Sequence, residues 1–362
     1  MESETVTRTV TCGMESSDEK NTVVEESCEI FREVMKHASD ILPSFDERQW
    51  RPNDTTLYRV AVMDSDFTER EVAGLNNLKS SVCREAAQKV AESFSSWESN
   101  GKPGSRPEPV QSGYIRLPKD CYEVVENDRG FGFKGQFISY NTVWWHLDTG
   151  CYQNRYLQQV LDGEAEFGSA ELFYNDGDPV VNITVRWDVE VLPVEDCDLL
   201  AGVDLGENAI YTVSVVDSDE TVCEVEIERG AEFRHHRERI DRKRERLQRK
   251  GDLNAVRLSK EREKYTEYVT DKVSKDVVDL VSDFDSVGIV LEDLTDYREH
   301  AEDPIHDWPY NKIQEKIVYK AKENSIPVEF VDPSYTSQRC RQCGSLGDRD
   351  GVDFFCDSCG YE

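Results

Sequence analysis

The sequence predicts a protein of mixed α and β structure, with an N-terminal half that contains strands and a second half in which strands and helices alternate. Residues 181–191 carry apolar side chains at every odd position and polar ones between them, which is typical of a strand with one wet face. Pro193 ends this strand, and we expect residues 193–198 to link the two halves. Beyond this linker, three strand-like runs precede helices that alternate with further strands, which favours a mixed α/β sheet.

Length and composition limit the classes of protein that fit. The 362 residues allow two or three domains, and an aromatic content of 10% argues against disorder. No apolar run approaches the roughly 18 residues of a membrane span, and the N-terminus lacks the basic start and apolar stretch of a signal peptide. A membrane or secreted protein is therefore excluded, and we expect a cytoplasmic one.

The charge balance is strongly acidic, with 74 Asp and Glu against 43 Lys and Arg and a formal net charge of −31. We interpret the chain as a folded halophilic protein from a salt-accumulating cell, where a Debye length of about 3 Å screens the repulsion between surface carboxylates. At ordinary ionic strength this charge would oppose the approach of a nucleic acid, whereas in molar salt it does not forbid one.

The N-terminal half predicts β-structure interrupted by helices. Residues 1–12 are expected to hold one strand, because Thr alternates with Val and Arg over residues 5–11, whereas residues 28–41 and 71–97 carry apolar side chains at helical spacing. The run 100–105 is rich in Gly, Pro, Asn and Ser and breaks the helical pattern. Short strands are expected at 114–117, 142–145 and 171–174.

The second half predicts five strands, at 199–206, 209–216, 221–227, 287–291 and 328–331. Two helical segments, broken at Gly251-Asp252, separate the third strand from the fourth. A helix that carries Ile313, Ile317 and Ala321 separates the fourth strand from the fifth. This order is typical of a mixed sheet of the ribonuclease-H type.

Two carboxylates stand at strand ends, since Asp204 follows one apolar strand and Glu292 follows another. If these strands are neighbours, both side chains project from one sheet edge, where their mutual repulsion calls for a divalent cation. Oxygen ligands suit Mg²⁺ or Mn²⁺, and two such ions can activate a water and neutralise the leaving oxygen in phosphodiester cleavage. The alternative is that Asp204-Leu-Gly206 is a simple turn and Glu292 is one acid among 74.

Four of the 11 cysteines form two Cys-x-x-Cys pairs near the C-terminus, and a glycine that permits a tight turn follows each pair. Four thiolates in tetrahedral array suit a structural Zn²⁺ without an open position for catalysis. The alternative is two redox or core cysteine pairs. The other seven cysteines are most simply buried thiols, because no secretory signal supports a disulfide framework. The candidate zinc ligands are Cys340, Cys343, Cys356 and Cys359.

Residues 229–275 are basic, with 16 Arg and Lys against 9 Asp and Glu and a net charge of +7. We interpret them as a helical hairpin that tracks phosphates. The alternative is a solvated amphipathic hairpin held by pairs such as Glu245 with Arg249. His235 and His236 within it are expected to face solvent rather than bind a ligand. The candidate nucleic-acid contacts are Arg234, Arg237, Arg242, Lys243, Arg246, Arg249 and Lys250.

These motifs occur in a characteristic order. Gly202-Val-Asp204-Leu-Gly206 precedes the basic helices with Leu247-Gln-Arg-Lys250, then Ile289-Val-Leu-Glu292-Asp-Leu294, then Tyr319-Lys-Ala321, and finally Asp332-Pro-Ser-Tyr-Thr-Ser337 with the two cysteine pairs. Over residues 199–362 the chain resembles the TnpB (OrfB) family of insertion-sequence proteins, relatives of the type V CRISPR effectors. The N-terminal half agrees with this family only in layout.

The resemblance implies a transposon-encoded, RNA-guided DNA nuclease, in which a transposon-derived guide RNA pairs with the target DNA strand and the protein reads a short adjacent motif. A RuvC-like half would cut, with Asp204 and Glu292 as the magnesium ligands. The implied regions are a wedge-like β-barrel at 1–20 and 106–197, a helical recognition insertion at 21–105, a RuvC-like domain at 198–333 with a basic helical hairpin at 229–285, and a zinc ribbon at 334–362.

One motif of the family has no match. Family members carry a third catalytic Asp in an Asp-x-Asn-Ala helix start beyond the last cysteine pair, whereas this sequence ends at Glu362. Losing one of three metal carboxylates would cost about 3–5 kcal/mol, or about 10²–10⁴ in rate, so we expect a truncated chain with impaired cleavage. The alternatives are a nuclease-dead RNA-guided regulator, a transposon remnant, or a strand-transfer transposase, into which the zinc ribbon fits poorly.

Overall fold

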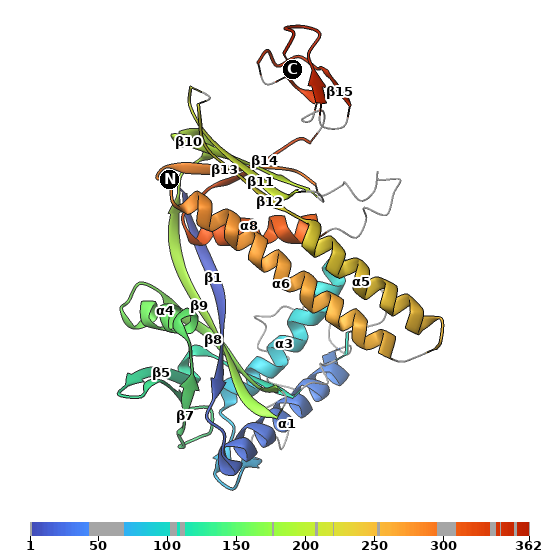
Figure 1. Ribbon diagram of the computed structural model, residues 1–362. Coiled ribbons are helices and arrows are strands. Elements are labelled where there is room, and N and C mark those ends of the chain that lie inside the picture. Colours follow the sequence, from blue (N-terminus) through green and yellow to red (C-terminus); the bar gives the residue numbers. More distant parts are fainter. Residues whose placement is uncertain are drawn as a thin grey trace. The chain divides into compact units, whose positions relative to one another are not determined.

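The chain forms two compact units, residues 7–188 and residues 1–6 with 189–362, which are described separately (Figure 1). No helix in the described ranges is both long enough and apolar enough to cross a membrane. The computed structural model describes residues 2–42, 69–101, 107–108, 113–175, 177–206, 209–219, 221–251, 254–294, 309–333, 338–340, 342–350 and 353–361.

A seven-stranded sheet organises residues 7–188, with the strand order β4-β8-β9-β1-β7-β6-β5. The alternation predicted for residues 181–191 is confirmed, since Val181, Ile183 and Val185 are fully buried on β9 while Arg186 is exposed. The strands are β1 (Glu2–Met14), β4 (Tyr114–Leu117), β5 (Tyr122–Asn127), β6 (Gly130–Gly135), β7 (Val143–Asp148), β8 (Glu166–Asn175) and β9 (Asp178–Val191).

Edge strand β5 contacts β8, the neighbour of the other edge strand, β4. The hydroxyl of Tyr122 on β5 donates to the carbonyl of Gly168 on β8, 3.0 Å away, and the short helix η5 (Lys119–Cys121) joins edge strand β4 directly to edge strand β5. Aromatic rings fill the interior, where Phe137 stacks on Trp145 with ring centroids 6.2 Å apart. Gly135 makes this packing possible, because a Cβ there would lie 2.6 Å from the Phe137 ring.

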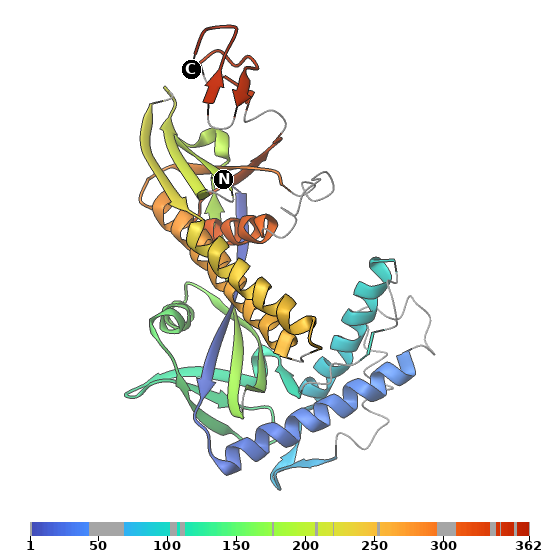
Figure 2. The ribbon, with the colours of Figure 1, turned by 45° about the vertical axis from the view of Figure 1, so that its right-hand side comes forward.

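Helices α1 (Asp18–Ile41), α3 (Ser80–Ser99) and α4 (Cys151–Leu161) complete this unit, and α1 and α3 are drawn in blue and cyan in Figure 2. Phe31 of α1 and Phe94 of α3 lie in the same buried core as the sheet. The helix predicted from residue 71 is wrong for its first turns. Residues 71–77 form the hairpin β2 (Glu71–Val72) and β3 (Asn76–Asn77) instead, because Ala73 and Gly74 take left-handed φ angles of 50° and 68° that end a helix.

An ion cluster fixes α3 to β4. The Arg116 guanidinium lies 3.4 Å from the Glu85 carboxylate and 3.1 Å from that of Glu92. Burial raises the pKa of Glu85, and the charge of Arg116 opposes this rise. The buried carboxylate of Glu85 therefore depends on the charge of Arg116. Loss of Arg116 would leave this carboxylate unpaired and would destabilise the packing of α3 on β4.

The other unit contains a five-stranded sheet in the order β12-β11-β10-β13-β14. Strand β11 runs antiparallel to both β10 and β12, whereas β13 is parallel to both β10 and β14. Long helical connections make the parallel pairing possible. All five strands predicted from the sequence are confirmed, as β10 (Leu199–Leu205), β11 (Ala209–Asp217), β12 (Val222–Arg229), β13 (Val287–Glu292) and β14 (Val328–Val331).

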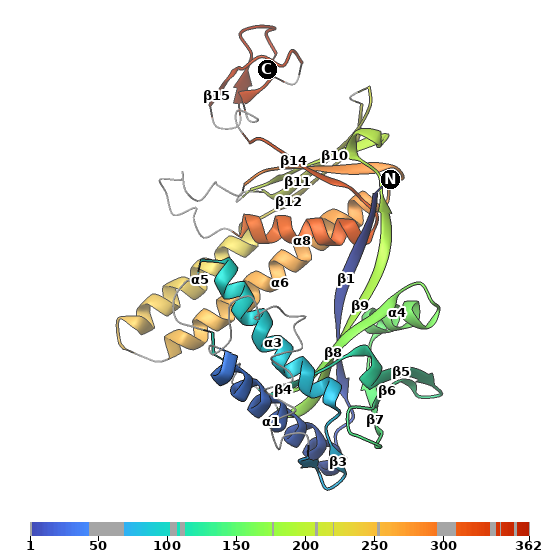
Figure 3. The same ribbon diagram turned by 180° about the vertical axis from the view of Figure 1, so that it is seen from behind.

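Helices α6 (Asn254–Ser282) and α8 (Tyr310–Glu323) cover one face of this sheet (Figure 3). Val273 and Val277 of α6 and Ile317 of α8 belong to one buried core with the inward-facing sheet residues, including Val203 and Ile289. Helix α5 (Ala231–Gln248) pairs with α6 as a hairpin. On the opposite sheet face, apolar side chains stay accessible, with exposed fractions of 38% at Leu200, 51% at Val225 and 57% at Ile227.

Two expectations are corrected in detail. The residues predicted as a linker include the short helix η6 (Val194–Asp196), whose Val194 is buried, so this stretch packs on the protein. The scattered cysteines are not all buried, since Cys151 and Cys223 are exposed and Cys197 is half-buried. The prediction holds for Cys12, Cys28, Cys83 and Cys121, where burial raises the thiol pKa.

Candidate functional site

Asp204 and Glu292 end two neighbouring parallel strands. On β10 and β13, Val203 pairs with Leu291, so the two carboxylates occupy the next position on each strand. Residues in register on parallel strands point to the same face of the sheet, and Val203 and Leu291 point into the core. Asp204 and Glu292 therefore lie on the opposite face at the same end, where Asp204 is exposed and Glu292 is half-buried.

This arrangement offers carboxylate oxygens to a cation. Two adjacent carboxylates repel each other unless a positive charge lies between them, and an all-oxygen ligand set fits Mg²⁺ or Mn²⁺. Within the described ranges, the one group of three or more clustered metal-binding side chains is the cysteine cluster. Among the described residues, Asp204 and Glu292 therefore do not belong to a group of three or more clustered metal-binding side chains.

A buried glutamine supports the backbone of Glu292. The side-chain amide of Gln314 on α8 donates to the Glu292 carbonyl at 2.5 Å, and Gln314 is only 5% exposed. The following residue, Asp293, donates its backbone N–H to the carbonyl of Val331 on β14 at 2.8 Å. Gln314 was not among the predicted site residues, because only a contact between a helix and a distant strand reveals its role. The one sequence feature that could have indicated this role is that Gln314 is a polar residue on the same helix face as the apolar residues Ile313 and Ile317.

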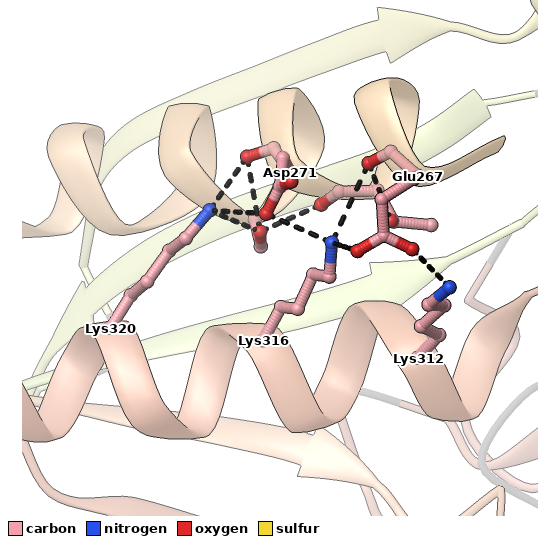
Figure 4. A network of polar contacts seen from close by, with 7 residues as sticks. Glu267, Asp271, Lys312, Lys316 and Lys320 are labelled. Carbon is pink, nitrogen blue, oxygen red and sulfur yellow. Dashed lines mark hydrogen bonds and ion pairs between the residues drawn. The ribbon is translucent and has the colours of Figure 1, made fainter. Parts of the chain in front are cut away.

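Three lysines of α8 tie this helix to two carboxylates of α6 (Figure 4). Lys316 reaches Glu267 at 2.5 Å and Asp271 at 2.9 Å. Lys312 also pairs with Glu267, and Lys320 lies 3.6 Å from Asp271. Because Gln314 is on the same helix, this network also holds the amide that contacts Glu292.

The network shifts the pKa of Glu267 and the pKa of Lys316 in opposite directions. Hydrogen bonds from Lys312 and Lys316 lower the pKa of Glu267. Burial alone would lower the pKa of Lys316, but the hydrogen bonds to Glu267 and Asp271 outweigh it and raise the pKa. A carboxylate with a lowered pKa stabilises the fold above its unfolded pKa and loses this effect in acid, whereas a lysine with a raised pKa loses it in alkali. The network therefore contributes fully between these two limits.

Lys316→Met is expected to lower the free energy of unfolding by about 1–2 kcal/mol at neutral pH, because Lys316 is nearly buried while its two partners can regain water. The difference from the wild type should shrink in acid, because protonation of Glu267, whose pKa is lowered by its hydrogen bonds with Lys312 and Lys316, removes the charge that Lys316 pairs with. Denaturant unfolding at several pH values measures both effects. Lys275→Met, which removes an exposed pair with Asp279 on α6, is the control and should change stability by less than about 0.5 kcal/mol. Equal losses in both variants would contradict the prediction.

The four C-terminal cysteines converge on one point. Their sulfur atoms all lie within 4.8 Å of one another, with Cys340 Sγ 3.5 Å from Cys359 Sγ and Cys343 Sγ 3.5 Å from Cys356 Sγ. Four sulfurs held tetrahedrally at about 2.3 Å from zinc would be about 3.8 Å apart, so the cluster could hold one structural zinc ion. The predicted convergence of the four cysteines is confirmed, and a disulfide or scattered core pairs do not describe it.

Local turns shape the two knuckles. Gly344 and Gly360 both adopt a φ of 70° and donate their N–H groups to the carbonyls of Cys340 and Cys356. The hairpin β15 (Asp348–Asp350) and β16 (Asp353–Phe355) connects the knuckles. Hydrogen bonds from Ser345 lower the pKa of Cys343 to about 6, which favours the thiolate that binds metal.

The predicted basic residues lie on α5 and just after it. Arg242, Lys243, Arg246, Arg249 and Lys250 are exposed, while Arg234 and Arg237 are half-buried. Some charges are paired along the helix, with Arg249 3.5 Å from Glu245 and Arg242 3.5 Å from Glu238. The i,i+4 pairs of the alternative interpretation are thus present at these two arginines.

Comparisons with known proteins agree on one group. Residues 310–362 match the family described as Cas12f1-like, TNB domain. A stretch of 225 residues is 28% identical to the CRISPR-associated endodeoxyribonuclease Cas12f1 of Sulfoacidibacillus thermotolerans and covers 57% of this chain and 52% of that protein. A stretch of 245 residues is 26% identical to a TnpB-like protein of Methanocaldococcus jannaschii and covers 62% of this chain and 81% of that protein.

Comparison of the fold with solved structures points to the same group of proteins as the sequence comparisons. A chain from the cryo-EM structure of a Cas12f1–sgRNA–target DNA complex superposes with a TM-score of 0.65 and 14% identity, covering 94% of this chain and 79% of that one. The mixed α and β architecture is therefore Cas12f-like. The match to the Sulfoacidibacillus protein spans about half of that relative's length.

Proposed function

Because the chain belongs to the TnpB family, we propose that it is a transposon-encoded protein that binds a guide RNA and target DNA and contains a RuvC-like, metal-dependent DNA endonuclease site. The match to a TnpB-like protein over most of that protein's length supports the assignment. The Cas12f1 neighbour, whose structure is a complex with sgRNA and target DNA, supports the expected partners, a guide RNA and a target DNA.

The proposed nuclease activity rests mainly on the pairing register of β10 and β13. It brings Asp204 and Glu292 to matching positions on one sheet face, which supports a shared divalent cation. The strand order β12-β11-β10-β13-β14 supports a ribonuclease-H-like arrangement. A bound Mg²⁺ or Mn²⁺ would activate water and stabilise the leaving oxygen of a phosphodiester. Asp204 and Glu292 would hold it, while Gln314 and the β14 pairing fix the Glu292 backbone.

The remaining regions have proposed roles of their own. The contact of edge strand β5 with β8, the neighbour of edge strand β4, supports a wedge-like barrel built from 1–20 and 106–197, and α1 and α3 support a helical insertion at 21–105. The exposed basic side chains of α5 support phosphate contacts within a RuvC-like domain at 198–333, and the cysteine cluster supports a zinc ribbon at 334–362. The net charge of −31 supports the proposal that the protein functions at high salt concentration.

A second function has one observation in its favour. Among the described residues, Asp204 and Glu292 are not part of a group of three or more clustered metal-binding side chains, and two-metal cleavage commonly needs more ligands than two carboxylates. A non-catalytic, RNA-guided DNA-binding regulator would keep the basic hairpin and the cysteine cluster and would need no complete metal site. The two functions share their partners and differ in whether matched DNA is cut.

Expression of the chain with the DNA that flanks its gene tests both functions. We expect a discrete RNA to co-purify, and the protein loaded with this RNA to bind matched duplex DNA more tightly than mismatched DNA. Incubation with Mg²⁺ or Mn²⁺, at low and at molar salt, should then cut only matched DNA, and chelation should stop the reaction.

Each outcome of this experiment decides between the functions. Guided binding without cutting would support the regulator and contradict the nuclease. Cutting of transposon ends without RNA would contradict both and favour a transposase. Absence of bound RNA, together with equal binding to matched and mismatched DNA, would contradict RNA guidance.

A further inference from the structure

Aromatic rings form a graded stack at the seam between α5 and α6. Phe233 of α5 is 3% exposed, and its ring stacks on Tyr265 of α6 with centroids 5.7 Å apart and an interplanar angle of 22°. Tyr265 in turn lies 6.4 Å from Tyr268 at 32°. His236, which was expected to face solvent, is instead half-buried and adds a fourth ring, with its centroid 3.8 Å from that of Tyr265. The series runs from a buried ring to Tyr268, which is 62% exposed.

The stack lies in the most basic part of an acidic protein. Arg239 donates toward His236 Nδ1 at 3.2 Å, and Arg237 lies over the Phe233 ring at 5.5 Å. Lys272, one turn beyond Tyr268, pairs with Asp276 at 2.7 Å. A carboxylate also lies near the rings. The pKa of Tyr265 is raised mainly by burial and further by the negative charge of Glu232. The net charge of residues 229–275 remains +7.

We propose that His236, Tyr265 and Tyr268 form a platform on which an unpaired nucleobase of a single-stranded nucleic acid stacks. The inference rests on the proposed function and adds a binding mode to it. Every base has a flat aromatic face, so an exposed ring backed by further rings binds bases without reading their sequence, while nearby cations attract the phosphates.

Base stacking on this platform would also allow the basic hairpin to bind a single-stranded nucleic acid in high salt. Contacts to phosphate weaken steeply as salt rises, because binding then gains less from released counterions. Ring stacking releases no counterions, so its contribution to the affinity stays the same as the salt concentration rises. It is therefore retained in the high salt that screens the repulsion between a nucleic acid and a protein of net charge −31. A platform inside a basic hairpin therefore combines a salt-sensitive and a salt-resistant contribution to the affinity.

The test compares three tyrosine variants in the full-length protein freed of RNA. Tyr268→Ala is expected to weaken binding of a labelled single-stranded oligonucleotide by about tenfold or more at every salt concentration, while Tyr268→Phe keeps the affinity. Tyr152→Ala is the matched control, because Tyr152 on α4 is also exposed, at 54%, and also contacts another tyrosine, Tyr156. This control should bind like the wild type.

The salt dependence and a duplex probe complete the experiment. Tyr268→Ala should leave the slope of log affinity against log salt unchanged and should not weaken binding to a blunt duplex, whose bases are already stacked. Lys243→Gln with Arg246→Gln should lower the slope by about one for each phosphate that the variant no longer neutralises. Thermal melting should show all variants folded.

Three results would overturn the platform. They are an unchanged affinity of Tyr268→Ala, an equal loss on single strand and duplex, and a loss in Tyr268→Phe as large as in Tyr268→Ala. If the basic variant weakens binding while Tyr268→Ala does not, only the platform fails. If the wild type binds no nucleic acid, the proposed function itself fails.

Discussion

Replacing Cys356 by serine is expected to prevent zinc binding at the four-cysteine cluster and to unfold the two knuckles and the hairpin β15–β16 around it. Cys356 is fully buried and contributes one of the four clustered sulfurs, so its replacement would remove one of the four thiolates that can bind the metal. Zinc binding supplies about 10–16 kcal/mol to comparable small zinc modules, far more than the short hairpin β15–β16 can supply by its own packing. Loss of the metal should therefore mean loss of the local fold.

Elemental analysis and hydrogen exchange measure this effect. The wild type should contain about one zinc per chain, whereas Cys356→Ser should contain far less, with fast exchange confined to the ribbon. Cys223→Ser is the matched control, because Cys223 is an exposed cysteine on β12 outside the cluster. Full zinc content in Cys356→Ser, or none in the wild type, would contradict a four-thiolate zinc site.

Regular patterns made much of the fold predictable. Strict alternation predicted β9, and apolar runs with clear breaks predicted β10, β11, β12, β13 and β14. The cysteine pairs predicted their own convergence, because each knuckle is a local structure with a required spacing. These features depend on short-range periodicity or on chemistry that few other patterns produce.

The remaining elements depend on turns and on distant contacts. Strands β5 and β6 were not predicted, because their apolar residues are mixed with Glu, Lys and Gly and their pairing depends on a turn in which Gly130 has a φ of 106°. Helix α4 was missed because only Tyr156 and Leu157 are buried in it. Long-range contacts, such as Gln314 with Glu292 or Lys316 with Asp271, leave no periodic signal in the sequence.

Asp204→Asn and Glu292→Gln are each expected to reduce Mg²⁺-dependent cleavage by about 10²–10⁴-fold or more, while the affinity for guide RNA and DNA stays nearly unchanged. Each substitution keeps the size of the side chain and removes the negative charge that would hold the cation. Cleavage rates with matched DNA and binding by the same protein samples measure the two effects separately. Glu190→Gln is the control, because Glu190 is an exposed carboxylate near the end of β9.

The double variant tests whether the two carboxylates share one ion. If Asp204 and Glu292 hold the same cation, removal of either one already releases it, so the double variant should cut no more slowly than the slower single variant. Independent roles would instead multiply the two losses. If the wild type binds matched DNA without cutting it, Mn²⁺ binding replaces cleavage as the measurement, with the same comparison. A parallel loss of nucleic-acid binding in Glu292→Gln would mean that Glu292 is structural, since its neighbours Asp293 and Gln314 belong to the sheet and helix contacts that hold β13.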